Sequence, residues 1–251
     1  MMIITAFVFT LGLLIGSFLN VCIYRIPENI SVAKGYSFCP TCKNRIQPYD
    51  LIPLVSYLFL KGSCRYCKSR ISVKYPLVEL FTGLLFLLVY FQFGLTPFAG
   101  LVALLVSVLV VVTFIDLKYQ IIPDGLVLIV FFAGIPAAFL SGLSPWEHVI
   151  GFFAVSVLLL IIALLSNGGM GGGDIKLMAA AGLFLGWKLI LLSLMIASVV
   201  GAIVSVGLLL LKKADRKSMV PFGPFLSIGI LLSVLYGNAI IVWYLNTFVF
   251  R

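Results

Sequence analysis

Eight long apolar runs alternate with short polar segments along the chain. A helix that crosses the hydrocarbon core of a bilayer needs about 20 predominantly apolar residues, and most of the runs approach that length. They predict transmembrane helices over residues 3–24, 75–93, 98–115, 124–140, 149–165, 175–186, 188–211 and 225–247. The sixth is short for a full span, so we expect it to be tilted or partly buried in protein. The predicted fold class is an all-α polytopic membrane protein with about eight transmembrane helices.

Residues 25–74 form the one sizeable polar segment of the chain. This segment divides the chain into three parts: a first transmembrane helix (1–24), a polar loop (25–74), and a membrane region with helices two to eight (75–251). The loop holds Cys39, Cys42, Cys64 and Cys67. The chemistry of the loop is therefore expected to differ from that of the membrane region.

Composition supports the membrane assignment and decides the topology. The chain is 63% hydrophobic and 10% charged, whereas soluble domains are about 45–50% apolar. Its net charge of +9 is not spread evenly, because 15 of the 17 Lys and Arg residues lie in alternate polar segments (25–74, 116–123, 167–176 and 212–221). Cytoplasmic loops carry such an excess. We expect these segments on the cytoplasmic side, both termini outside, a lipid bilayer as the surrounding partner, and no nucleic-acid partner.

The four loop cysteines form a repeated pattern. Two Cys-x-x-Cys knuckles, beginning at Cys39 and Cys64, are each followed by a Lys and an Ile at the same offsets. Their spacing is close to that of a Cys₄ zinc ribbon, in which four thiolates surround a structural zinc. A redox-active pair in either knuckle is the alternative. The fifth cysteine, Cys22, is expected to be a small apolar residue of the first helix.

Two aspartates, Asp116 and Asp174, lie at the ends of odd-numbered helices, and the charge asymmetry places both at the cytoplasmic edge of the membrane. The helix pair between them returns the chain to the same face, so the carboxyl groups can meet. Ionisable residues at membrane depth are costly and are commonly functional. Neighbouring carboxyl groups can share a proton, which suits peptide hydrolysis: the ionised acid takes a proton from water, and the protonated acid polarises the scissile carbonyl.

Asp174 ends a glycine-rich stretch that begins at Gly168. Glycines allow a peptide to approach the backbone closely. The stretch is not a phosphate-binding loop of the Gly-x-x-x-x-Gly-Lys-Ser/Thr type. A structural alternative remains, in which Asp174 caps the sixth helix and Asp116 pairs with Lys118 or Lys176.

Other polar residues have structural interpretations. Glu79 and Asp124 lie in the first turns of predicted helices, where a carboxylate complements the helix N-terminus. Asn20 either holds helices together or lies near a polar cavity. His148, the single histidine, follows a predicted outer turn at 141–146, and we expect it at the membrane interface rather than in catalysis.

Several motifs, in order over nearly the whole chain, resemble those of the type IV prepilin peptidases, which are Gly-x-Gly-Asp intramembrane aspartyl proteases. The motifs are Gly16-Ser17-Phe18-Leu19-Asn20-Val21, the paired knuckles, Tyr75-Pro76-Leu77-Val78-Glu79, Ile115-Asp116 with Pro123-Asp124, Gly171-Gly172-Gly173-Asp174-Ile175-Lys176, and Pro221-Phe222-Gly223-Pro224. The Gly-x-Gly-Asp element alone is shared with other intramembrane aspartyl proteases. The ordered set is specific.

The resemblance implies a bifunctional enzyme of the bacterial cytoplasmic membrane. Such enzymes cleave the basic leader of prepilins and pseudopilins after a Gly and then methylate the new N-terminal residue, commonly Phe, with S-adenosylmethionine. The catalytic aspartates would be Asp116 and Asp174, whereas Asp124 is not implied to be catalytic. The methyltransferase function goes with the cysteine loop. Asn20 and Glu79 flank that loop and are candidates for S-adenosylmethionine contacts.

Two alternatives differ in function. The first is a peptidase without methyltransferase activity, against which the intact knuckles argue. The second is a small transporter in which Asp116 and Asp174 bind an ion or a proton. Transporters of this size commonly contain inverted repeats, but residues 1–120 and 121–251 share no pattern.

Overall fold

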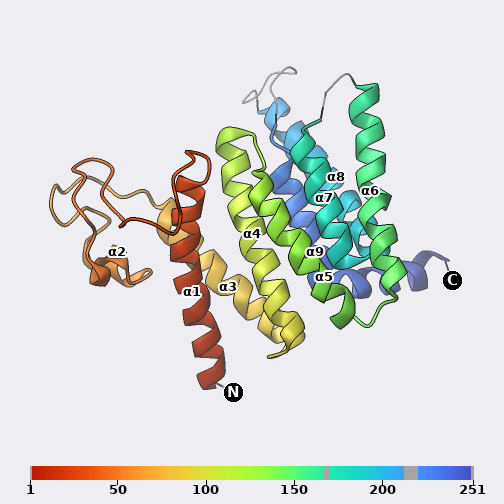
Figure 1. Cartoon of the computed structure of the whole chain (residues 1–251), viewed down its shortest axis with the longest axis horizontal. Coiled ribbons are helices and arrows are strands. Elements are labelled where there is room, and N and C mark those ends of the chain that lie inside the picture. Colours follow the sequence, from red (N-terminus) through yellow and green to blue (C-terminus); the bar gives the residue numbers. More distant parts are fainter. Residues whose placement is uncertain (1, 167–169, 212–219, 250–251) are drawn as a thin grey trace. The chain divides into compact units, whose positions relative to one another are not determined.

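The computed structural model describes residues 2–166, 170–211 and 220–249. It contains all eight predicted helices: α1 (Met2–Arg25), α3 (Lys74–Phe93), α4 (Pro97–Tyr119), α5 (Asp124–Leu140), α6 (Pro145–Leu165), α7 (Gly172–Leu185), α8 (Trp187–Leu210) and α9 (Gly223–Tyr244) (Figure 1). Two short helices, η1 (Pro48–Leu51) and α2 (Val55–Phe59), lie in the polar loop, and a π-helical turn, η2 (Leu245–Val249), follows α9. Within these ranges there is no strand, which confirms the all-α class.

The eight helices are not equal as membrane spans. Among the described residues, six helices are long and apolar enough to cross a bilayer: α1, α3, α4, α6, α8 and α9 with η2. The other two are shorter, with 17 residues in α5 and 14 in α7. In α7 every residue from Leu177 to Gly182 is buried, as expected for a helix surrounded by protein on all sides. The expectation that this helix is partly buried in protein is confirmed.

The chain forms two compact units, Met1–Ala99 and Gly100–Arg251. In the first unit α1 packs against α3. The contact is close because a Cβ atom on Gly12 would lie 2.8 Å from the Cα of Gly83, and one on Gly16 would lie 2.8 Å from the Cα of Glu79. Small residues permit such approach between membrane helices. Helix α3 therefore belongs to the same unit as α1. The predicted division at residue 75 had grouped it with the later helices.

In the second unit α7 packs against α5, α6, α8 and α9 (Figure 1). Gly151 of α6 and Gly182 of α7 bring these two backbones together, since a Cβ atom on either would collide with the backbone of the other helix. The helices around α7 therefore hold its N-terminal turn, which carries Asp174, in a defined place.

Two boundaries differ from the prediction in ways that matter. Helix α4 continues to Tyr119, so Asp116 lies inside its last turn and not after the helix. Helix α6 begins at Pro145, which places His148 inside the helix and not after an outer turn. His148 is 1% exposed, and its ring nitrogens lie 2.8 Å from the Ser141 hydroxyl and 2.9 Å from the Leu183 carbonyl oxygen. The interfacial prediction for His148 was therefore wrong, because the ring is buried and both of its nitrogens have hydrogen-bond partners.

Candidate aspartate pair and cysteine-loop site

Asp116 is held in place by a residue far along the chain. Its side chain lies in the last turn of α4 and the residue is 5% exposed. The backbone N–H of Gly223, the first residue of α9, donates a hydrogen bond of 2.9 Å to Asp116 Oδ2. A carboxyl group buried this far needs such a partner, since an unsatisfied polar group away from water is costly.

Gly223 is a site residue to which the sequence assigned no role. A Cβ atom at this position would lie 2.6 Å from Asp116 Oδ2 and 3.0 Å from its Cγ. Any other residue would displace the carboxyl group or the start of α9. The signal in the sequence was a glycine in the Pro221–Pro224 segment directly before an apolar run.

Asp174 lies in the first turn of α7 and is partly exposed. Its carboxyl group is close enough to Asp116 for the two to interact electrostatically. The approach depends on Gly173, where a Cβ atom would lie 2.8 Å from the Cβ of Ile122, in the link between α4 and α5. The structure thus brings the two predicted aspartates together. Gly168 and Gly169, like Lys212, Lys213, Arg216 and Lys217, lie outside the described residues.

Of the two lysines that the structural alternative assigned to Asp116, Lys118 donates to the Tyr119 hydroxyl at 2.8 Å and Lys176 pairs with another acid. Lys176 Nζ is 2.8 Å from Asp124 Oδ1, and both side chains are largely exposed. Within the described ranges, the recorded ion pairs are this one and Arg65–Asp50, so neither Asp116 nor Asp174 is in an ion pair there. Two acids near each other without a cation between them can share a proton.

The two cysteine knuckles have the same backbone structure. In each, the Lys after the second cysteine has a positive φ, 60° at Lys43 and 59° at Lys68. The N–H of Lys43 bonds the Cys39 carbonyl at 2.9 Å, and that of Lys68 bonds the Cys64 carbonyl at 3.0 Å. The repeat in the sequence is therefore a repeat in structure, and it turns both cysteine pairs toward one point.

The four sulfur atoms all lie within 4.8 Å of one another. Cys39 Sγ is 3.8 Å from Cys67 Sγ, and Cys42 Sγ is 4.0 Å from Cys64 Sγ. Zinc–sulfur bonds of about 2.3 Å in a tetrahedron place sulfur atoms roughly 3.8 Å apart, so this donor set fits zinc. All four cysteines are free thiols.

The knuckle backbone also favours the thiolate that zinc binds. The pKa of Cys39 is lowered to about 6, chiefly by a hydrogen bond from the Cys42 backbone N–H. The pKa of Cys67 is also lowered, first by a hydrogen bond from the Ser69 hydroxyl. Metal ligands must be deprotonated, so these contacts favour the thiolate at two of the four positions. At Cys42 a hydrogen bond from the Asn44 backbone N–H lowers the pKa, but burial and hydrogen bonds with the other three cysteines outweigh it and raise the pKa to about 11.

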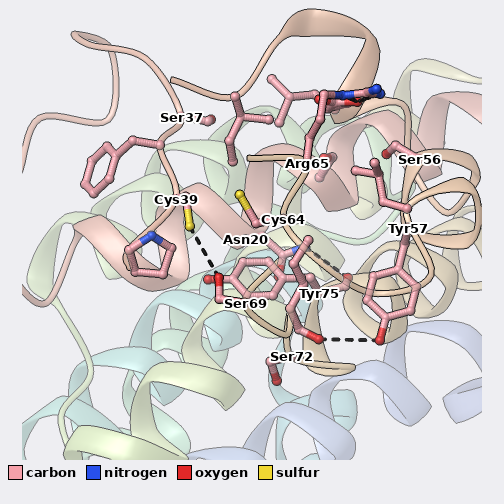
Figure 2. A pocket seen from close by; sticks show the side chains of 18 of the residues that line it. Asn20, Ser37, Cys39, Ser56, Tyr57, Cys64, Arg65, Ser69, Ser72 and Tyr75 are labelled. Atoms are coloured by element: carbon pink, nitrogen blue, oxygen red, sulfur yellow. Dashed lines mark hydrogen bonds and ion pairs between the residues drawn. The ribbon is translucent and has the colours of Figure 1, made fainter. Parts of the chain in front are cut away.

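A cavity of about 420 Å³ lies inside the first unit, between the cysteine loop and helices α1 and α3. Figure 2 shows Asn20, Cys39, Cys64, Ser69 and Tyr75 around it. Aromatic rings contribute to its walls, from Tyr24, Tyr57, Tyr66 and Tyr75. Its volume is typical of small-molecule and cofactor sites, which span about 300–1,000 Å³.

Asn20 and Glu79 both line this cavity. Asn20 Nδ2 donates a hydrogen bond of 3.1 Å to the Tyr75 carbonyl oxygen and so joins α1 to α3. The same residue lines the cavity, so both interpretations of Asn20 apply. Glu79 is 9% exposed, and its Oε2 accepts the Leu54 N–H at 2.9 Å. Leu54 lies just before α2 with a φ of 61°. Glu79 therefore anchors the loop to the helix pair, in the second turn of α3 and not at its start.

Two family models match the chain, one in each unit. The Bacterial Peptidase A24 N-terminal domain matches residues 10–93, and the Type IV leader peptidase family matches residues 103–206. Their division agrees with the division of the structure between Ala99 and Gly100. No solved structure matches the chain.

Relatives match over nearly the full length. A prepilin leader peptidase/N-methyltransferase of Aeromonas salmonicida (strain A449) is 39% identical over 273 residues, covering 96% of this chain and 93% of the relative. Proteins of the same name from Bacillus subtilis (strain 168) and Pseudomonas aeruginosa are 35% and 36% identical, covering 95% and 94% of this chain and 96% and 91% of the relatives. The resemblance found in the motifs is confirmed, and the chain belongs to the type IV leader peptidase family of aspartic proteases.

Proposed function

We propose that this protein cleaves the leader peptide of type IV prepilins or pseudopilins after a Gly and then methylates the new N-terminal residue, commonly Phe. The observation that carries the proposal is the electrostatic interaction of a buried Asp116 with Asp174, with neither acid in a recorded ion pair among the described residues. Relatives named for both activities cover nearly the whole chain. The transporter alternative has no comparable support.

The aspartate pair supplies what peptide hydrolysis needs. The ionised member takes a proton from water, and the resulting hydroxide attacks the scissile carbonyl carbon. The protonated member donates its proton to the carbonyl oxygen, so the two acids exchange roles. The tetrahedral intermediate then collapses: the carbon–nitrogen bond breaks, the newly protonated acid gives its proton to the leaving amine, and the other acid takes a proton from a hydroxyl group of the intermediate. Gly223 N–H holds the Asp116 carboxyl group in one orientation, which matters because small misplacements of catalytic groups are costly.

The test of the peptidase is cleavage of a prepilin by purified protein. Asp116→Asn and Asp174→Asn each remove a carboxyl group but keep its shape, and each should abolish cleavage. Asp124→Asn is the matched control, since Asp124 is exposed and paired with Lys176, and it should cleave normally. Retained cleavage in either dyad variant would remove the proposed mechanism.

The methyltransferase function is assigned to the first unit. S-adenosylmethionine supplies the methyl group when bound, and the aromatic cavity between the cysteine loop and α1–α3 is the proposed site. Cys39, Cys42, Cys64 and Cys67 would hold a structural zinc, for which the four sulfur positions are suited. A loop of this size has little core of its own, so metal would contribute folding free energy.

Metal analysis tests the cysteine assignment. We expect about one zinc per chain, lost in Cys39→Ser together with methylation. The control is Cys22→Ser, since Cys22 is buried in α1 outside the cluster, and this variant should keep its zinc. A native preparation without metal but with full methylation would contradict the zinc proposal.

The membrane topology follows from the charge distribution. We propose a multi-pass protein of the bacterial cytoplasmic membrane, with both termini outside and the cysteine loop and both aspartates on the cytoplasmic side. A prepilin has an apolar membrane helix and a basic leader, so its scissile bond would lie at the same face. Labelling of single introduced cysteines from each side of the membrane tests this; outside labelling of the loop would overturn it.

A further inference from the structure

Among the described residues, the cavity of the first unit is lined by one buried acid that has no counterion. Two acids line it, Asp50 and Glu79. Asp50 is compensated by Arg65, whose Nη2 lies 2.6 Å from Asp50 Oδ1 and whose Nε lies 2.9 Å from Oδ2. Glu79 is 9% exposed and takes part in no ion pair among the described residues. A buried carboxylate is costly unless something positive pairs with it.

The cations around the cavity do not compensate Glu79. Arg25 is buried but donates to the carbonyl oxygens of Ser31 and Lys34 at 2.9 Å, and to that of Tyr36 at 3.0 Å. Arg65 is occupied by Asp50. Arg70 lines the cavity but is exposed, so water solvates its charge. A positive ligand is therefore the natural partner of Glu79.

The contacts of Glu79 hold its carboxyl group in place and leave capacity for a ligand. Oε2 accepts the Leu54 N–H, and the Ser17 side chain lies within hydrogen-bonding reach. An ionised carboxylate can accept about four hydrogen bonds. The close approach of Gly16 to the Glu79 backbone fixes the α3 turn that carries it. The group is thus preorganised and faces the cavity.

The two cationic reactants are the amino group of the cleaved pilin and the sulfonium methyl donor, and they differ in how far they enter the membrane. Glu79 is five residues into α3, about 7 Å along an apolar helix, and lines the cavity together with residues of α1. The methyl acceptor is the N-terminus of an apolar membrane helix and reaches this depth. The water-soluble methyl donor is matched instead by the polar loop end, with Ser37 and Arg65.

We propose that Glu79 binds the α-amino group of the cleaved pilin and accepts its proton during methyl transfer, an assignment that rests on the proposed methyltransferase function. The bound ammonium first loses one proton to water, and the neutral amine nitrogen then attacks the methyl carbon of the sulfonium donor. A nitrogen–carbon bond forms, the carbon–sulfur bond breaks, and its electron pair stays on sulfur. Positive charge moves from sulfur to nitrogen, and the secondary ammonium then gives a proton to Glu79. A fixed carboxylate beside the nitrogen stabilises this charge where it develops.

The test uses Glu79→Gln in the full-length protein. Glutamine keeps an oxygen that can accept the Leu54 N–H but removes the charge. Zinc content and prepilin cleavage should stay at wild-type values and report an intact protein. Methyl transfer to an already cleaved peptide beginning with Phe should fall about tenfold or more, as for loss of a charged hydrogen bond. Binding of S-adenosylmethionine should not change.

A peptide-binding experiment distinguishes failure of this inference from failure of the proposed function. Without a methyl donor, wild-type protein should bind the free-amine peptide about tenfold more tightly than its N-acetylated form, and Glu79→Gln should lose that preference. Glu28→Gln, the same change on an exposed residue outside the cavity lining, should keep it. Equal binding of both peptides by wild type would overturn the assignment of Glu79. Unchanged methylation in Glu79→Gln would also overturn this assignment. The same holds if S-adenosylmethionine binding falls by the same factor as methylation. Failure of wild type to methylate would overturn the methyltransferase proposal instead.

Discussion

The two units place their polar groups in different ways. In the first unit the four cysteines lie on two short turns, each stabilised by hydrogen bonds within five residues. In the second unit Asp116 is bonded by a backbone group 107 positions away. A local site can be recognised from spacing alone, whereas a long-range site depends on how helices pack. One chain thus joins a candidate metal site built from two local turns and an acid pair built from tertiary structure.

The largest expected effect is separation of the two activities by one substitution. Asp116→Asn should abolish prepilin cleavage, because an amide neither takes a proton from water nor shares one. The same variant should still methylate a peptide supplied with its leader already removed. Quantitative mass spectrometry of both products checks this. Loss of both activities would mean that the units do not work independently.

Removing zinc should have the opposite effect. A strong chelator, or Cys39→Ser, should abolish methylation, because structural zinc sites contribute folding free energy to the loop that carries them. Cleavage of a prepilin should remain, since Asp116 and Asp174 lie in the other unit. Parallel assays on the same preparation test this selectivity, and loss of cleavage in step with zinc would contradict it.

Gly223→Ala should damage cleavage without unfolding the protein. The added Cβ atom would lie 2.6 Å from Asp116 Oδ2, and displacement of a catalytic group by about 1 Å can cost roughly 100-fold in rate. Gly207→Ala is the matched control, because nothing lies within 4 Å of a Cβ atom there. Single-turnover cleavage rates of the two variants should differ by about that factor. Equal rates would show that the Gly223 N–H does not position Asp116.

Zinc retention should depend on pH in one direction. The Cys39 thiol has its pKa lowered to about 6 from 9.0. A lowered pKa in the folded loop contributes stability that is complete above the unfolded value and is lost as the pH falls toward 6. Zinc should therefore stay bound at neutral pH and dissociate progressively at and below pH 6. Metal release followed with a zinc indicator checks this; release that increases with rising pH would contradict it.

The smallest effect is expected at the Asp50–Arg65 pair. The hydrogen bonds from Arg65 lower the pKa of Asp50, so its contribution is present at neutral pH and is lost as the pH falls below the ordinary range of an aspartate. Asp50→Asn should lower the free energy of unfolding of the loop by about 0.5–1 kcal/mol. Denaturant titration of the zinc-bound protein measures this. An effect of several kcal/mol would make the pair a structural centre comparable to the cysteines.

Much of the fold follows from patterns that act over short distances. Apolar runs of about 20 residues form helices in a membrane because each backbone group must find its partner within the segment. Each knuckle brings its two cysteines close together, because the two residues between the cysteines and the following Lys, which has a positive φ, close a tight turn. The positions of Asp116 and Asp174 on helices that return to one face also follow from the helix count.

The contacts that complete both sites do not follow from any local pattern. Gly223 approaches Asp116, the Leu54 N–H meets Glu79, and His148 finds Ser141 and Leu183 only because separate segments pack together. The helices, the charge asymmetry, the cysteine turns and the family can be predicted from the sequence, since these depend on neighbouring residues or ordered motifs. The backbone group that orients Asp116 and the buried acid that faces the cavity depend on long-range packing, because a buried polar group is satisfied by whatever packing brings to it.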